Sequence, residues 1–162
     1  MYKRQPPHTA DNTRELLVYL ANHYELGIID PGNHPKQKDG ELVVRAPWAI
    51  TADGTIKLSG SIGEGRKLAV VHASRKDLLR ASTSAAADAL LRVEGRIAGA
   101  LVLACSGRLG VLGSEFPDEP ALIRQRVGAP IGGACVFGEI AKNERDVDAF
   151  FNTTAVIIAF GA

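Results

Sequence analysis

The chain has 162 residues, 46% of them hydrophobic, and its 19 basic and 18 acidic side chains leave a formal net charge of +1. This balanced charge argues against binding to nucleic acid or to an anionic membrane surface. No apolar run approaches the ~20 residues that span a bilayer, and the first residues lack the apolar stretch of a secretion signal. The two cysteines lie in apolar runs, which is typical of buried, reduced thiols. We therefore expect a cytoplasmic protein. Its size predicts one domain over residues 11–162 after a tail over residues 1–10.

The first third of the chain predicts a helix, a loop and a hairpin. Leucines at helical spacing follow a capping Asp11 until Gly27 ends the pattern. The stretch over 28–40 is rich in proline, glycine, Asp and Asn, which is typical of a loop. Strands over 41–50 and 55–62 flank an Asp-Gly turn and so predict a hairpin. The proline within the first strand predicts that this strand is bulged or at an edge.

The rest of the chain alternates strands with helices. Ser74 opens a long helix, because Asp77 three residues later completes a capping box. The expected elements are a strand over 67–73, a helix from Ser74 to Gly95, a strand over 100–105, a helix over 120–127 that Gly128 ends, a strand over 130–140, a polar loop over 141–150 and a strand over 153–160.

This order of elements predicts an α/β (α+β) fold, with one mixed β-sheet of about six strands and helices packed on it. Strand–helix–strand connections return parallel and right-handed, so the strands that contain Val70, Val102 and Ala134 are expected to share a direction. The final strand is expected to return antiparallel. Continuous apolar strands also predict that both faces of the sheet are covered, by these helices or by a partner.

Polar side chains are expected to converge at one edge of this sheet, where the parallel strands end and the last strand begins. They are His72, Cys105, Ser106, Arg108, Gly138, Glu139, Asn152, Thr153 and Thr154. Arg108 can bind a carboxylate through two hydrogen bonds, and Glu139 can bind an ammonium group. Asn152 and the threonine hydroxyls can add neutral hydrogen bonds. This edge would therefore suit a small zwitterion such as an amino acid.

Each of these residues also has a purely structural interpretation. Arg108 can pair with Glu139 and close the sheet edge, since buried charges are usually paired. Cys105 can be a small packed core residue, and His72 a core histidine with its hydrogen bonds satisfied. Residues 152–154 can be a turn before the last strand.

Three stretches of the chain resemble the C-terminal half of FIST-domain proteins, the FIST C domain. They are "ALVLACSGRLGVLGSE", "APIGGACVFGEIA" and "FNTTAVIIAF", and the resemblance covers roughly residues 11–160. It implies a sensory domain of a signal-transduction protein that binds a small ligand, with amino acids or similar small carboxylates as the proposed ligands. The positions that match the family's motifs are Cys105, Arg108, Gly138, Glu139, Asn152 and Thr154.

The resemblance also bears on partners. The N-terminal half usual in the family is expected to be absent here, so a separate protein or a second copy of this chain would complete the pocket. No nucleic acid and no membrane are expected as partners.

Two other functions remain open. One is a cysteine-dependent enzyme, with Cys105 as nucleophile, His72 as base and Glu139 as the orienting group. The other is a haem sensor, since one branch of the family binds haem and His23 or His72 could be the ligand. The favoured prediction is a domain without catalytic residues, metal or cofactor, because the four histidines are scattered and the loop after Cys105 lacks the Gly-x-Ser-x-Gly pattern.

Overall fold

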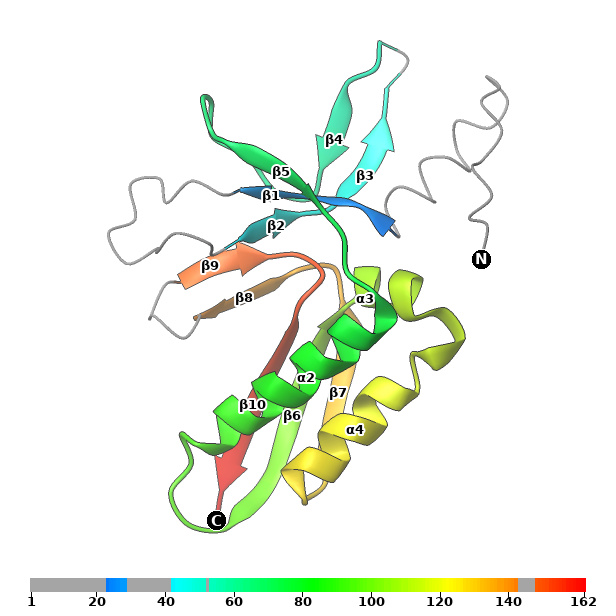
Figure 1. Ribbon diagram of the computed structural model, residues 1–162. Helices are drawn as coiled ribbons and strands as arrows, with labels where there is room; N and C mark the ends of the chain where they lie inside the picture. The colour runs from blue at the N-terminus through cyan, green and yellow to red at the C-terminus, as the bar shows by residue number, and fades with distance from the viewer. Residues whose placement is uncertain (1–22, 29–41, 52, 143–147) are drawn as a thin grey trace.

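The computed structural model describes residues 23–28, 42–51, 53–142 and 148–162. The described chain forms two layers, with the helices packed on a three-stranded sheet in one and several small sheets gathered in the other (Figure 1). The predicted α+β class is therefore confirmed. The prediction of a single sheet of about six strands is wrong, because the strands divide among sheets of two or three.

The main sheet has the strand order β10-β6-β7. Its central strand is β6 (Ile97–Cys105), with β7 (Ile131–Val136) parallel on one side and β10 (Ala155–Gly161) antiparallel on the other. Both directions agree with the sequence-based prediction. The third strand that was expected to be parallel, around Val70, belongs to another sheet.

The helices of the described chain are α2 (Arg75–Leu90), α3 (Ser106–Leu112), the 3-10 helix η2 (Gly113–Glu115) and α4 (Asp118–Val127). The predicted capping box at the start of α2 is present, since the Ser74 hydroxyl accepts from the Asp77 amide and the Asp77 carboxylate accepts from the Ser74 amide. Gly128 ends α4 in the left-handed conformation, with φ of 68°. The helix α3 begins directly after β6, which the sequence analysis did not predict.

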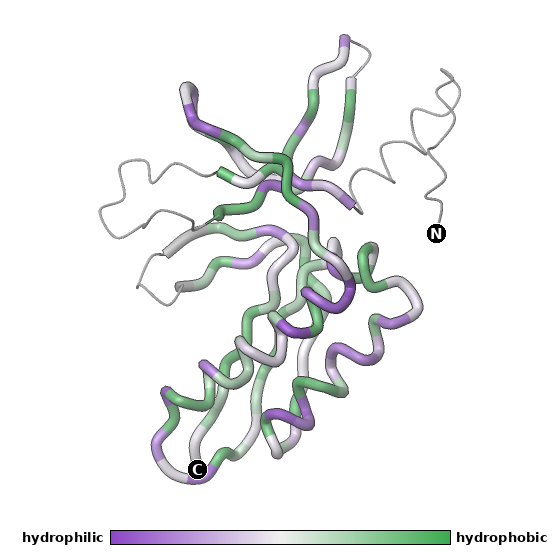
Figure 2. Tube along the Cα trace, viewed as in Figure 1, coloured by the Kyte–Doolittle hydropathy of each residue, from purple (hydrophilic) through white to green (hydrophobic). Residues whose placement is uncertain are grey.

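The core lies between the helices and one face of the main sheet. Ala100 and Val102 of β6 pack with Ala86 of α2 and with Ile123 and Val127 of α4, all of them buried. Figure 2 shows hydrophobic (green) segments along the strands and helices of this layer. The expectation that both sheet faces are covered is not met by the described helices. The reason is that α2 and α4 pack beside each other on the same face, and the outer face leaves Ile158 and Phe160 of β10 partly exposed.

The second layer is built from antiparallel strands. Its largest sheet has β1 (Glu25–Ile28) between β2 (Val43–Arg45) and β5 (Leu68–Val71). The predicted hairpin is confirmed as β3 (Pro47–Ile50) and β4 (Ile56–Leu58), and its register shifts between Pro47 and Ala49, as the proline predicted. The first strand, expected over 41–50, is divided, because residues 43–45 form β2 and pair with β1. A second hairpin joins β8 (Glu139–Lys142) to β9 (Asp148–Phe151).

Three sequence-based boundaries need correction in this layer. The segment expected to end a helix at Gly27 is strand β1, because its backbone pairs on both sides with neighbouring strands. The strand over 67–73 pairs with β1 and not with β6. The polar loop expected over 141–150 includes parts of β8 and β9. The predicted tail over 1–10 and most of the first helix lie outside the described residues.

Candidate functional site

The strand ends that carry most of the polar residues predicted to meet at one sheet edge do lie next to each other in the structure. Cys105 pairs with Val136 at the end of the two parallel strands, and Ala104 pairs with Ala155 at the start of β10. The segments that follow β6 and β7, and the turn that precedes β10, therefore emerge at the same edge. His72 reaches this region from a different sheet, one residue after β5.

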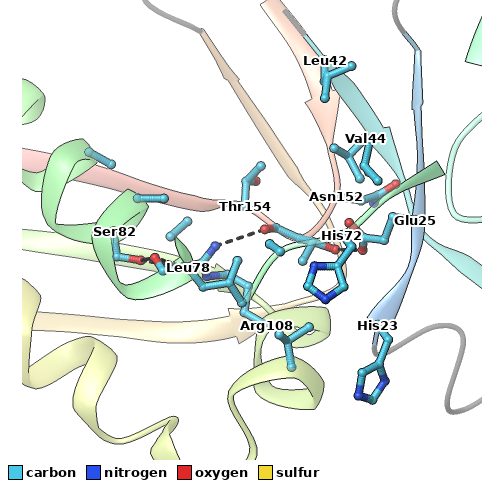
Figure 3. Close-up of a pocket in the computed structure, with 17 residues that line it drawn as sticks. His23, Glu25, Leu42, Val44, His72, Leu78, Ser82, Arg108, Asn152 and Thr154 are labelled. Atoms are coloured by element: carbon cyan, nitrogen blue, oxygen red, sulfur yellow. Dashed lines mark hydrogen bonds between the residues drawn. The ribbon is translucent and has the colours of Figure 1, made fainter. Parts of the chain in front are cut away.

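A cavity of about 430 Å³ lies between this edge and the sheet that contains β1. Five of the predicted residues line it: His72, Arg108, Asn152, Thr153 and Thr154 (Figure 3). Glu25 and Ser82 add polar groups, and most of the remaining wall is apolar, including Leu42, Val44, Val71, Leu78 and Val111. Small-molecule sites commonly combine an apolar wall with a few convergent polar groups in this way.

Arg108 connects the helices around this cavity and is only 3% exposed. Its Nε donates to Glu119 Oε1 at 2.8 Å, and its Nη2 donates to the same oxygen and to Ser82 Oγ at 2.6 Å. Nη2 also lies 3.0 Å from the Leu78 carbonyl oxygen, and Nη1 donates to the Thr153 carbonyl at 3.1 Å. A single side chain of α3 therefore ties α2, α4 and the turn before β10 together.

The predicted pairing of Arg108 with Glu139 is wrong, because Glu119 in the first turn of α4 takes that position. Glu139 is 3% exposed, and its Oε2 accepts a hydrogen bond from the Thr154 hydroxyl at 2.7 Å. The Cys105 thiol lies beside Glu139. Glu139 therefore belongs to a small polar cluster behind the cavity wall.

Burial raises the pKa of the Cys105 thiol and also raises the pKa of the Glu139 carboxyl. A catalytic cysteine needs the opposite, a stabilised thiolate with a base in reach. His72 lies at the exposed rim of the cavity and is not the buried core histidine of the structural alternative, because β5 is an edge strand of a small sheet. The site therefore gives no support to a cysteine nucleophile.

The turn before β10 holds two further predicted residues in specific conformations. Asn152 is 2% exposed, and its Oδ1 accepts from the Ala46 amide at 3.4 Å. Thr153 has φ of 56°, the left-handed region that is costly for a threonine. Strain of this kind persists only where surrounding contacts hold it, and here Arg108 and Glu25 both bind Thr153.

Ser106 and Gly138 complete the predicted set but do not line the cavity. Ser106 begins α3. Gly138 has φ of 147°, and a Cβ added there would lie 2.4 Å from Phe150 Cζ. The chain can turn from β7 into β8 at this point because Gly138 has no side chain.

Glu25 is the one acidic group that the described part of the chain places in the cavity wall, and the sequence analysis missed it. Its Oε1 accepts a hydrogen bond from the Thr153 hydroxyl. Burial raises the pKa of Glu25, and this outweighs the lowering effects of the Thr153 hydroxyl and of Arg108. No sequence signal marks Glu25, because the residue gains its place only when β1 pairs with β2 and β5.

The raised pKa values of Glu25 and Glu139 predict a pH dependence of stability. A raised carboxyl pKa means that the folded chain binds more protons than the unfolded chain between the ordinary and the raised value. The free energy of unfolding should therefore fall as pH rises through that window, by at most about 1.4 kcal/mol per pH unit for each group.

We expect Glu25→Gln to reduce this slope and to be more stable than the wild type above the window, since glutamine keeps an acceptor for Thr153. Urea unfolding at several pH values measures both effects. An unchanged slope in the variant would show that burial of Glu25 does not govern its protonation.

Comparison with known protein families gives a match. The family model of the FIST C domain matches residues 2–142, which is most of the chain. No curated protein and no solved structure matches the chain significantly. Within the described residues, no helix is long and apolar enough to cross a membrane, and no group of three or more His, Cys, Asp or Glu side chains is placed to hold a metal ion. The chain belongs to the FIST C domain family, a domain of sensory signal-transduction proteins.

Proposed function

We propose that the chain is a non-catalytic sensory domain that binds a small organic ligand in the cavity beside Arg108. The observation that carries this proposal is the cavity itself, about 430 Å³ in volume, with a largely apolar wall and a few polar groups. The cavity is formed where the two layers of the fold meet, so a ligand there would contact both. A sensory domain needs such a contact if binding is to change the arrangement of its parts.

The ligand class that suits these groups best is an amino acid or a similar small carboxylate. The Nη1 group of Arg108 donates one N–H to the Thr153 carbonyl, and a ligand carboxylate can accept from its second N–H. Glu25 and the Thr154 hydroxyl can receive the ammonium group, and the apolar wall can hold a side chain. The arrangement differs from the one expected from the sequence, because Glu25 replaces Glu139 as the acidic group.

A thermal-shift screen of the full chain tests this proposal. The compounds are amino acids, the matching carboxylic acids without the amino group, the matching amines, and haem, since two histidines line the cavity. A ligand at 100 times its Kd should add about 2.7 kcal/mol to the free energy of unfolding. We expect amino acids to give the largest shift, because they engage both Arg108 and Glu25.

Two variants of α2 locate the site. Ala81 lines the cavity, so Ala81→Leu should fill part of it and abolish the shift. Ser84→Leu, three residues further along the same helix and exposed, adds a similar side chain outside the cavity and should keep the shift. A shift that survives Ala81→Leu would place the ligand elsewhere, and no shift with any compound would contradict the proposal.

A further inference from the structure

A second cavity, of about 300 Å³, lies between α4 and the strands β6 and β7. Its floor is made of small residues, since Ala104 of β6 and Gly133 and Cys135 of β7 lie below the start of the helix. Val102, Phe116, Pro120, Ile123 and Ile131 supply larger apolar walls. We call this space the α4–β7 groove. It opens at the edge of the sheet, where Cys135 is exposed.

Among the described residues that line the α4–β7 groove, Glu119 is the one that is charged. It is 1% exposed, and its Oε1 accepts hydrogen bonds from Arg108 and from the Ser82 hydroxyl. Its Oε2 is buried and has no hydrogen-bond partner among the described residues. A buried acceptor without a donor destabilises the fold, and more so when it is charged. Glu119 lines the groove, so a donor that reached Oε2 from the groove would remove that cost.

The charges around Glu119 decide which kind of donor fits. Arg108 already balances the Glu119 carboxylate, so an organic cation in the groove would be a buried charge without a counterion. A ligand carboxylate would face the Glu119 carboxylate and be repelled. A neutral hydroxyl or amide can donate to Oε2 without adding a charge, and the apolar walls then cover the body of the ligand.

We propose that the α4–β7 groove binds a small neutral molecule with a compact apolar body and one O–H or N–H donor directed at Glu119 Oε2. This site is separate from the cavity at Arg108, and none of its lining residues lines that cavity. The proposal is therefore independent of the sensory function proposed above. Cys135 gives it a reporter, since the thiol lies in the groove and is exposed, whereas Cys105 is buried and lines neither cavity.

The experiment measures protection of Cys135 from alkylation by iodoacetamide in the full chain, read by mass spectrometry. Three probes share an aromatic body: benzyl alcohol has a neutral donor, benzyl methyl ether has none, and benzylammonium carries a charge. We expect benzyl alcohol to protect at about tenfold lower concentration than the ether, the change that a hydrogen bond to a charged group provides. Benzylammonium should protect more weakly than the alcohol.

Methyl NMR spectra give a second measurement that requires no variant. Benzyl alcohol should shift the methyl resonances of Val102, Ile123 and Ile131 and leave those of Val71 and Val111 unchanged, since the last two line the other cavity. Equal protection by the alcohol and the ether would overturn the proposal, because Glu119 would then play no part. Strongest binding by benzylammonium, or no protection by any probe, would also overturn it.

Discussion

Replacing Arg108 by methionine is expected to lower the free energy of unfolding by about 3–5 kcal/mol, as when one partner of a buried ion pair is removed. Arg108 and Glu119 are 3% and 1% exposed, so the carboxylate would remain buried without its cation. The Leu78 and Thr153 carbonyls would also lose a donor. A loss of this size is a large part of the 5–15 kcal/mol that stabilises a typical domain. Urea unfolding followed by circular dichroism measures it.

A matched control for this effect is Arg75→Met. Arg75 pairs with Glu115 at 2.8 Å, but both side chains are about half exposed, at 51% and 43%. Exposed ion pairs contribute 0–1 kcal/mol, so this variant should remain close to the wild type. The double variant Arg108→Met with Glu119→Met removes both buried charges and should recover part of the loss. If Arg108→Met cost no more than Arg75→Met, the buried pair would not stabilise the fold.

The expected loss of stability in Arg108→Met makes this variant unsuitable as a test of ligand binding. A variant that loses binding because the domain has unfolded says nothing about the cavity. The change at Ala81 avoids this difficulty, because it adds volume to the cavity wall and leaves every hydrogen bond of Arg108 in place.

Replacing Gly133 by alanine is expected to lower the free energy of unfolding by about 1–3 kcal/mol or more. A Cβ at this position would lie 2.1 Å from the Val102 carbonyl oxygen and 2.9 Å from its carbonyl carbon. Both atoms belong to the backbone of β6, so no side-chain rotation can relieve the overlap. The two parallel strands would have to separate at the centre of the main sheet, where β6 and β7 pair.

The neighbouring glycine provides the control. A Cβ at Gly132 would meet no atom within 4 Å, so Gly132→Ala should be neutral or stabilising by about 0.4–1 kcal/mol through the entropy of the unfolded chain. Thermal or urea unfolding of the two variants, one residue apart on the same strand, compares them directly. Equal stabilities would mean that β6 and β7 are not as close as the structure places them.

The elements that the sequence predicts correctly are those whose signals are local. The capping box of Ser74 and Asp77 defines the start of α2, and the glycine at position 128 defines the end of α4. The apolar run before Cys105 predicts a central strand, and β7 and β10 take the predicted directions beside it. The convergence of polar residues at one edge follows from these directions.

The elements that the sequence does not predict depend on partners far along the chain. The strand β5 resembles a central parallel strand in its composition, but it pairs with β1, which itself lies in a segment with helical spacing of leucines. The choice of Glu119 over Glu139 as the partner of Arg108 depends on how α4 packs against α2 and α3. Glu119 occupies the first turn of its helix, where acidic residues are common, so its position in the sequence does not mark it as a site residue.

The distant pairing of β10 has a consequence for how the domain is made. The strand β6 can pair with β7 once the helices α3 and α4 between them are made, but its other edge is completed only by residues 155–161. Contacts such as Glu25 with Thr153, 128 residues apart, and Arg45 with the Phe150 carbonyl, 105 residues apart, also depend on residues near the end of the chain. During synthesis on the ribosome, the N-terminal strands must therefore wait for β9 and β10 before the two layers can join. Pairings between such distant segments require the loop to close, at an entropic cost, before the contacts stabilise the fold. Folding should therefore be slow relative to helical domains of this size.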